Sequence, residues 1–99
     1  MTTILRTAVF DRWLKKLKDR RGRARIIERI RSLERGHVGD CAPLGRGVVE
    51  LRIHFGPGYR IYFMRTGETQ LLLLIGGTKK NQGADIRKAK ALAALIRRK

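Results

Sequence analysis

Apolar residues in the first third of the chain recur every three or four positions, as they do along the buried faces of amphipathic helices. Residues 2–5 fit a short leading strand, and a helix is expected from about Thr7. The DRRGR segment around Gly22 breaks that helix, and a second helix stops near Gly36. We expect the two helices to form a hairpin. Their apolar positions are Val9, Phe10, Trp13, Leu14 and Leu17, followed by Ile26, Ile27, Ile30 and Leu33.

The pattern changes from helical to strand-like in the middle of the chain. Residues 36–47 are dense in glycine and predict a loop. Over residues 48–55, apolar positions alternate with Glu50, Arg52 and His54. This alternation is typical of a strand with one buried face and one polar face.

Two more strands and a helix are predicted after this point. The Gly56-Pro57-Gly58 turn should reverse the chain into a strand over residues 59–65. In residues 70–75, QLLLLI, both the odd and the even positions are apolar. This predicts a strand that is covered on both faces and ends at Gly76-Gly77. A helix over about residues 81–97 completes the order β-α-α-β-β-β-α, an α+β fold.

Composition adds a size limit and a strong charge to this picture. Ninety-nine residues fit a single domain over residues 1–99, and 42% apolar residues can form its core. The 24 Lys and Arg residues exceed the eight Asp and Glu residues by enough to give a formal net charge of +16, which favours an anionic partner such as a polyanion or an acidic protein. No apolar run is long enough to span a bilayer, so no membrane partner is expected. The absence of a secretory signal pattern and the lone Cys41 favour the cytoplasm.

The polar face of the predicted hairpin collects residues suited to a phosphodiester. If the hairpin turns symmetrically about Pro57, His54 faces Arg60 and Arg52 faces Tyr62. Guanidinium groups match phosphate oxygens, an imidazole moves protons near neutral pH, and a phenol stacks on a base or donates a hydrogen bond. The alternative is that the arginines are ordinary solvated strand residues and that the histidine is incidental.

Lys79 and Lys80 form a second candidate group, close to the start of the last helix. Helix starts and nearby lysines favour anions, whereas the alternative is a solvated loop. The two His residues and Cys41 are too widely separated in sequence for a metal site. We therefore expect no metal and no cofactor, and any cleavage of RNA would proceed without metal.

Several motifs together resemble a known family. GVVELRIHFGPGYRIYF (residues 47–63) and LLLLIGGTKKNQGADIRKAK (residues 71–90) are similar to the addiction-module killer subfamily of the RelE/ParE toxins, also known as HigB-like or phage Gp49-like. FDRWLKKL and IIERIRSLERGHVGD resemble the helical segments of the same subfamily. The resemblance implies an α+β fold in which an N-terminal helical hairpin packs on a small antiparallel sheet, with a C-terminal helix.

The resemblance also implies an activity. Toxins of this kind are part of type II toxin–antitoxin modules and cleave mRNA on the ribosome without metal, by attack of the ribose 2′-OH on the adjacent phosphate. The implied catalytic residues are Arg52, His54, Arg60 and Lys79. Arg60 would stabilise charge on the transition state, His54 would be the general base, and Lys79 would contact the phosphate.

The implied RNA-binding residues are Arg52, Arg60, Tyr62, Lys79 and Lys80. One departure from the family concerns the general acid, because the segment ALAALIRRK carries neither the Tyr nor the His-Tyr pair of several RelE-like nucleases. The acid is therefore unassigned, with Lys79, Lys80 and Tyr62 as candidates.

The implied partners are ribosome-bound mRNA and a cognate helix-turn-helix antitoxin, with operator DNA bound only through the antitoxin complex. Two alternatives stay open at this point. A ParE-like protein would share the fold and inhibit DNA gyrase by protein contact. A non-catalytic nucleic-acid-binding domain or an inactive toxin would bind through charge alone.

Overall fold

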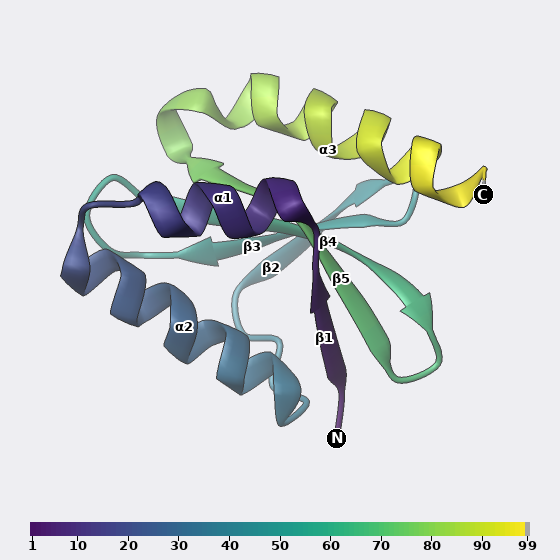
Figure 1. Ribbon diagram of the computed structural model, residues 1–99, viewed down its shortest axis with the longest axis horizontal. Coiled ribbons are helices and arrows are strands. Elements are labelled where there is room, and N and C mark those ends of the chain that lie inside the picture. The colour runs from purple at the N-terminus through teal and green to yellow at the C-terminus, as the bar shows by residue number, and fades with distance from the viewer. Residues whose placement is uncertain (99) are drawn as a thin grey trace.

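A mixed β-sheet forms the middle layer of the protein, whose computed structural model describes residues 1–98 (Figure 1). Within these residues the sheet has five strands in the order β1-β5-β4-β3-β2. β1 runs parallel to β5, whereas the other neighbouring strands are antiparallel. The expectation of an antiparallel sheet is therefore wrong at the β1 edge. The strands are β1 Thr3–Arg6, β2 Cys41–Gly45, β3 Val48–Ile53, β4 Tyr59–Gly67 and β5 Gln70–Thr78.

Thr7 fixes β1 and the first helix, α1 (Ala8–Lys16), onto β5. Its backbone N–H donates to the Leu73 carbonyl at 3.1 Å, and its hydroxyl donates to the Leu74 carbonyl at 2.7 Å. The same hydroxyl accepts from the backbone N–H of Phe10 at 3.0 Å and caps the helix. One residue therefore ends the strand and starts the helix.

Helices cover both faces of the sheet. On one face α1 packs over β5, and α2 (Arg20–Glu34) packs over β1 and β3. On the other face α3 (Gln82–Arg97), preceded by the short 3-10 turn Lys79–Asn81, covers β4 and β5. α1 and α2 diverge from the turn between them in Figure 1 and each rests on the sheet, whereas the sequence pattern suggested a hairpin. No helix within residues 1–98 has the length and apolar character needed to cross a membrane.

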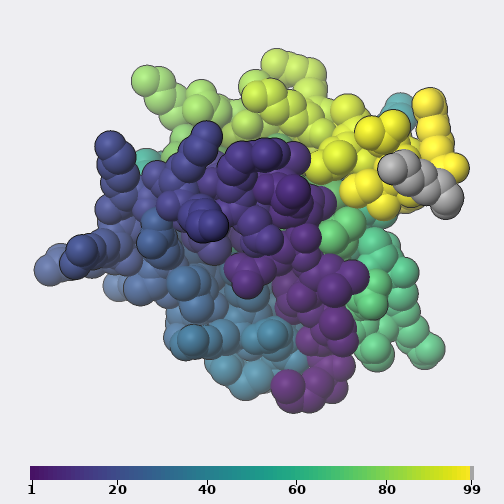
Figure 2. All heavy atoms as spheres, in the orientation of Figure 1, coloured from purple at the N-terminus to yellow at the C-terminus, as the bar shows by residue number. Residues whose placement is uncertain are grey.

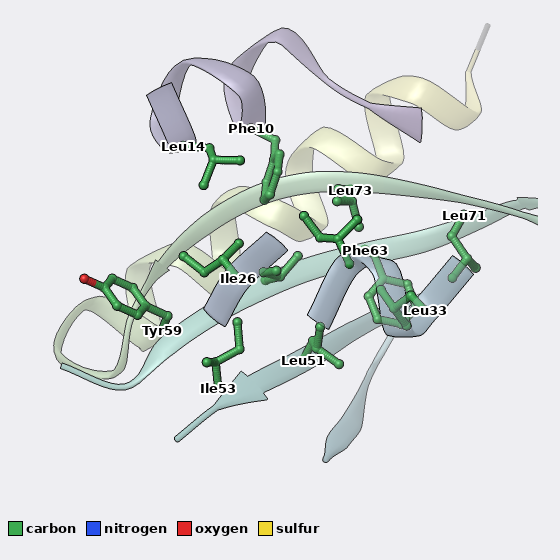
Figure 3. Close-up of a cluster of buried hydrophobic side chains, with 12 residues drawn as sticks. Phe10, Leu14, Ile26, Leu33, Leu51, Ile53, Tyr59, Phe63, Leu71 and Leu73 are labelled. Carbon is green, nitrogen blue, oxygen red and sulfur yellow. The ribbon is translucent and has the colours of Figure 1, made fainter. Parts of the chain in front are cut away.

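Each face of the sheet has its own apolar cluster. Figure 3 shows the larger cluster, in which Phe10 and Leu14 of α1 point into the same interior as the strand residues. The smaller cluster lies beneath α3, where Ala89 and Ala93 allow the helix backbone to approach the sheet closely. The buried members of the larger cluster are Phe10, Leu14, Ile26, Ile30, Leu33, Leu51, Ile53, Tyr59, Ile61, Phe63, Leu71 and Leu73.

β4 is buried on both faces from Tyr59 to Met64, because helices cover both sides of the sheet. The predicted hairpin instead places Arg60 and Tyr62 on an open polar face. This expectation is wrong because a period of two shows which residues share a face and not whether a helix covers it. Tyr62 and Met64 contribute to the cluster beneath α3.

β2 occupies part of the segment expected to be a loop. Cys41 pairs with Leu51 and Pro43 with Val49 along β3. β2 is an edge strand, where proline is tolerated because one side of the backbone faces solvent. Residues 45–47 turn the chain into β3 with positive φ angles. Backbone pairing of this kind leaves no apolar periodicity for sequence analysis to detect.

α2 begins at Arg20, so Gly22 lies in its first turn and does not break a helix as expected. The Asp19 carboxylate caps this turn by accepting from the Gly22 N–H at 3.0 Å, and it accepts from the Tyr59 hydroxyl at 2.7 Å. The hydrogen bond from Tyr59, followed by that from Gly22, lowers the pKa of Asp19. A side chain at position 22 would collide with Tyr59, so this glycine permits α2 to pack closely against β4.

Gly76 and Gly77 lie inside β5, which continues to Thr78 rather than ending at the glycine pair. A Cβ atom at position 76 would overlap the ring of Trp13, and one at position 77 would overlap the carboxylate of Asp85. Trp13 comes from α1 and Asp85 from α3, on opposite faces of the sheet. The pair therefore admits close contacts on both faces.

Candidate functional site

The turn between β3 and β4 is longer than expected and is not centred on Pro57. Ile53 pairs with Tyr59, and Arg52 pairs with Arg60, so residues 54–58 form the turn. Within residues 1–98, His54 has no cross-strand partner in this ladder, and the expected pairing of His54 with Arg60 is wrong. The register differs from the symmetric one by two residues, which leaves every side chain on its expected face.

Three of the four predicted catalytic residues line one hollow of about 350 Å³ beside this turn. His54 approaches it with a side chain that is 70% exposed, and Lys79 is also exposed. Arg60 reaches it from within the sheet with a side chain that is only 7% exposed. We call this space the turn hollow; its lining residues are His54, Phe55, Gly56, Pro57, Gly58, Arg60 and Lys79.

Arg60 is held in place by backbone carbonyls and a buried carboxylate. Its Nη1 donates to the carbonyls of Gly58 at 3.1 Å and Tyr59 at 3.3 Å. Its Nε lies 4.0 Å from Glu50 Oε2. The Arg60 Nε atom is buried and has no hydrogen-bond partner within residues 1–98. Lys79 is tied to the same turn, because its backbone N–H donates to the Gly58 carbonyl at 2.8 Å. The Arg60 guanidinium and the backbone of Lys79 are therefore both tied to the Gly58 carbonyl.

Glu50 is a buried residue to which the sequence analysis assigned no role. Its side chain is fully buried, and Oε1 accepts from Arg52 Nε at 3.0 Å. Oε2 accepts from Tyr62 Oη at 3.2 Å and from Gln82 Nε2 at 2.7 Å. A buried carboxylate requires such partners. The sequence feature that could have indicated a role for Glu50 is that it is the one acidic residue among basic residues on the polar face of the predicted strand.

Tyr62 lies in the interior with a completely buried side chain. Burial, followed by the charge of Glu50 and the hydrogen bond to it, raises the pKa of Tyr62. A stacked contact between this ring and an RNA base, as expected from the sequence, does not fit this arrangement. Lys80 is exposed and is not among the residues that line the turn hollow within the described chain.

Arg52 lies in a second hollow that shares His54 with the turn hollow. Its Nη1 is 3.9 Å from Asp40 Oδ1, and Asp40 Oδ2 is hydrogen-bonded to His54 Nε2. The hydrogen bond with His54 lowers the pKa of Asp40, and the positive charges of Arg52 and Arg29 act in the same direction. We call this space, of about 360 Å³, the side hollow; its lining residues are Arg25, Glu28, Arg29, Asp40, Arg52, Ile53 and His54.

The donor set of the two hollows is basic, and no group of three or more His, Cys, Asp or Glu side chains within residues 1–98 is placed to hold a metal ion. The cations of the turn hollow come from the start of β4 and from the residue after β5, whereas the side hollow takes Arg25 and Arg29 from α2 and Arg52 from β3. A phosphate group that entered the turn hollow would lie in a space lined by His54, Arg60 and Lys79, whose cationic groups form strong hydrogen bonds with phosphate oxygens.

Residues 12–99 match the family of the phage-derived protein Gp49-like (DUF891). The chain belongs to this family. A protein from Haemophilus influenzae strain Rd, described as an uncharacterized protein, is 45% identical over 87 residues, which cover 88% of each chain. The match to the Gp49-like family includes β2 to β5 and α3. Both hollows of this Gp49-like protein therefore lie within the matched region.

Proposed function

We propose that this Gp49-like protein is the toxin of a toxin–antitoxin module and cleaves mRNA on the ribosome as a metal-independent endoribonuclease. The observation that supports this proposal is the turn hollow, where His54, Arg60 and Lys79 line a space of about 350 Å³. The wider RelE/ParE relationship and the HigB-like subfamily belong to the same proposal. They rest on the motif resemblance.

In the proposed reaction a ribose 2′-OH attacks the adjacent phosphorus. His54 accepts the 2′-OH proton as general base, and Arg60 and Lys79 stabilise the added negative charge on the phosphate oxygens. The bond to the 5′-oxygen then breaks, giving a 2′,3′-cyclic phosphate and a 5′-hydroxyl end. Lys79, an exposed donor of the turn hollow, is our candidate for protonating the leaving oxygen.

The net charge of +16 supports the proposed partners. Ribosome-bound mRNA and an acidic segment of a helix-turn-helix antitoxin would both be attracted to such a surface. The antitoxin would neutralise the toxin by covering the turn hollow. Operator DNA would be bound by the complex through the antitoxin.

The proposal is tested by brief induction of the protein and mapping of mRNA 5′ ends. We expect new ends within translated regions and an arrest of growth. His54→Ala should reduce cleavage by about 10²–10⁴-fold, the usual range for a general base, and Lys79→Ala should also reduce it. Arg31→Ala is the control, because it removes one positive charge from an exposed position of α2 outside the turn hollow.

Two outcomes would contradict this function. Cleavage that persists at the wild-type rate in the double variant of His54→Ala and Lys79→Ala would exclude the turn hollow as the site. DNA-damage signalling without new RNA ends would exclude RNA cleavage and would indicate inhibition of gyrase by protein contact. Circular dichroism and urea denaturation of each purified variant show whether the variants fold.

A further inference from the structure

A continuous series of polar contacts joins the start of α3 to the imidazole of His54. Gln82, in the first turn of α3, donates to Glu50, and Glu50 accepts from Arg52. Arg52 in turn approaches Asp40, which is hydrogen-bonded to His54 Nε2. We call these five side chains the acid–base relay.

Arg52 occupies the centre of the acid–base relay and is directed at two carboxylates. Nε is 3.0 Å from Glu50 Oε1, and Nη1 is 3.9 Å from Asp40 Oδ1. Arg52 lines the side hollow and is absent from the described lining of the turn hollow. Its guanidinium therefore already has two anionic partners in the free protein, whereas Arg60 retains a buried Nε without a hydrogen bond within residues 1–98.

We infer that Arg52 is a positioning residue, which links buried Glu50 to Asp40 so that Asp40 holds His54 for proton transfer. This inference rests on the proposed function and replaces the expected contact of Arg52 with RNA. It assigns new roles to Glu50 and Asp40. Because the Asp40 carboxylate only accepts, the proton of the shared hydrogen bond belongs to His54 Nε2. Nδ1 is then the nitrogen available to the substrate.

The anchoring matters because the Asp40–His54 pair is too exposed to be rigid alone. The Asp40 side chain is 46% exposed and that of His54 is 70% exposed, and isolated surface pairs contribute little. The backbone around Asp40 is held from both sides: its carbonyl accepts from the Arg52 N–H at 2.9 Å, and Arg29 Nη2 donates to the Val38 carbonyl at 3.1 Å. Glu50 adds a buried anchor, where hydrogen bonds to charge are strong.

The inference is tested first by kinetics with Arg52→Lys. Lysine keeps the positive charge but lacks the planar group that reaches two carboxylates. We expect kcat for RNA cleavage to fall by about tenfold to 100-fold, as when a reacting group is displaced by about 1 Å, with KM nearly unchanged. The same substitution should add no further loss in a His54→Ala background. A raised KM with unchanged kcat would overturn the inference and would restore Arg52 as an RNA contact.

A second measurement does not depend on cleavage. Nitrogen-detected NMR of the free protein distinguishes the two neutral tautomers of each histidine, and exposed His37 is the internal reference. We expect His54 to carry its proton on Nε2 in the wild type and to approach a mixture in Arg52→Lys and in Asp40→Ala. His37 should be unchanged. An unchanged His54 tautomer in both variants would overturn the inference.

The two experiments separate the inference from the proposed function. If the wild-type protein cleaves no RNA, the proposed function fails, and the tautomer of His54 still decides whether Arg52 and Asp40 position that side chain. If the wild type cleaves RNA and Arg52→Lys is fully active with an unchanged tautomer, the function stands and the acid–base relay is refuted. Glu50→Gln should lower kcat as Arg52→Lys does, because it removes the buried negative charge from Arg52.

Discussion

The two tyrosines of the chain are buried residues whose hydroxyl groups donate to carboxylates. Burial, followed by the hydrogen bond to Asp19, raises the pKa of Tyr59 to about 12, and the pKa of Tyr62 is also raised. A raised pKa in the folded state stabilises the protein below the unfolded value of 10.0, and this stabilisation is lost as the pH rises through about 12. We expect ultraviolet titration to detect almost no tyrosinate near pH 10 in the folded protein.

The same titration in urea provides the contrast. In the unfolded chain both phenols should ionise near their ordinary pKa of 10.0. A folded-state midpoint near that value would contradict the burial of both hydroxyl groups. Tyr59→Phe leaves only Tyr62, so the tyrosinate signal released on unfolding at high pH should fall by half.

Some residues of the candidate site could be predicted from the sequence. Its motif resemblance selected His54, Arg60 and Lys79, and the fold brings these three together at the turn hollow. It missed Glu50 and the interior position of Tyr62. Strand alternation places both residues on the polar face, but only the position of α3 decides that this part of the face is buried.

At the level of elements, the close contact between β5 and α1 depends on the absence of a side chain at Gly76. Gly76→Ala places a methyl group against the rigid ring of Trp13 and should destabilise the fold by about 1–3 kcal/mol. Gly83→Ala is the matched control, because position 83 is open within α3. It should stabilise the protein by about 0.4–1 kcal/mol. Urea denaturation of both variants measures these effects, and a neutral Gly76→Ala would contradict the packing described.

The apolar pattern predicted most elements, and it failed where backbone geometry decides. The helical period located α1 and α3 to within a few residues. It did not locate the start of α2, because Gly22 suggested a break in the helix there. The turn between the helices in fact ends at Asp19, which caps α2. β5 continues past Gly76, where the glycine pair allows Trp13 of α1 and Asp85 of α3 to lie close to the strand backbone. These contacts join distant parts of the chain and cannot be seen in the local sequence.

At the scale of the whole molecule, the charge of +16 is spread over dimensions of 35 × 31 × 23 Å. Figure 2 shows side chains projecting from the dark blue region around the turn between α1 and α2, where Lys15, Lys16, Lys18 and Arg20 are exposed. The Debye length is about 30 Å at 0.01 M salt and about 8 Å at 0.15 M, so repulsion spans the molecule only at low salt. We expect the urea midpoint of unfolding to rise over this range of sodium chloride.

Urea is suited to this measurement because it carries no charge. A midpoint that stays constant or falls with salt would show that the like charges do not destabilise the folded state.

The overall α+β architecture could be predicted from the order of apolar segments. The parallel edge did not follow, because the pairing of β1 with β5 joins residues that are far apart in the chain and nothing in either segment specifies the direction.

The pairing of β1 with β5 also limits when the sheet can be completed during synthesis of the chain. β1 is synthesised before its hydrogen-bonding partner β5, and α1, α2, β2, β3 and β4 lie between them in the chain. Lys79 and Gln82 emerge later still. A nascent chain that has not reached this point lacks both the sheet edge and the last cation of the turn hollow. The β1 edge of the sheet and the turn hollow can therefore be completed only after Thr78 and Lys79 have been added to the chain.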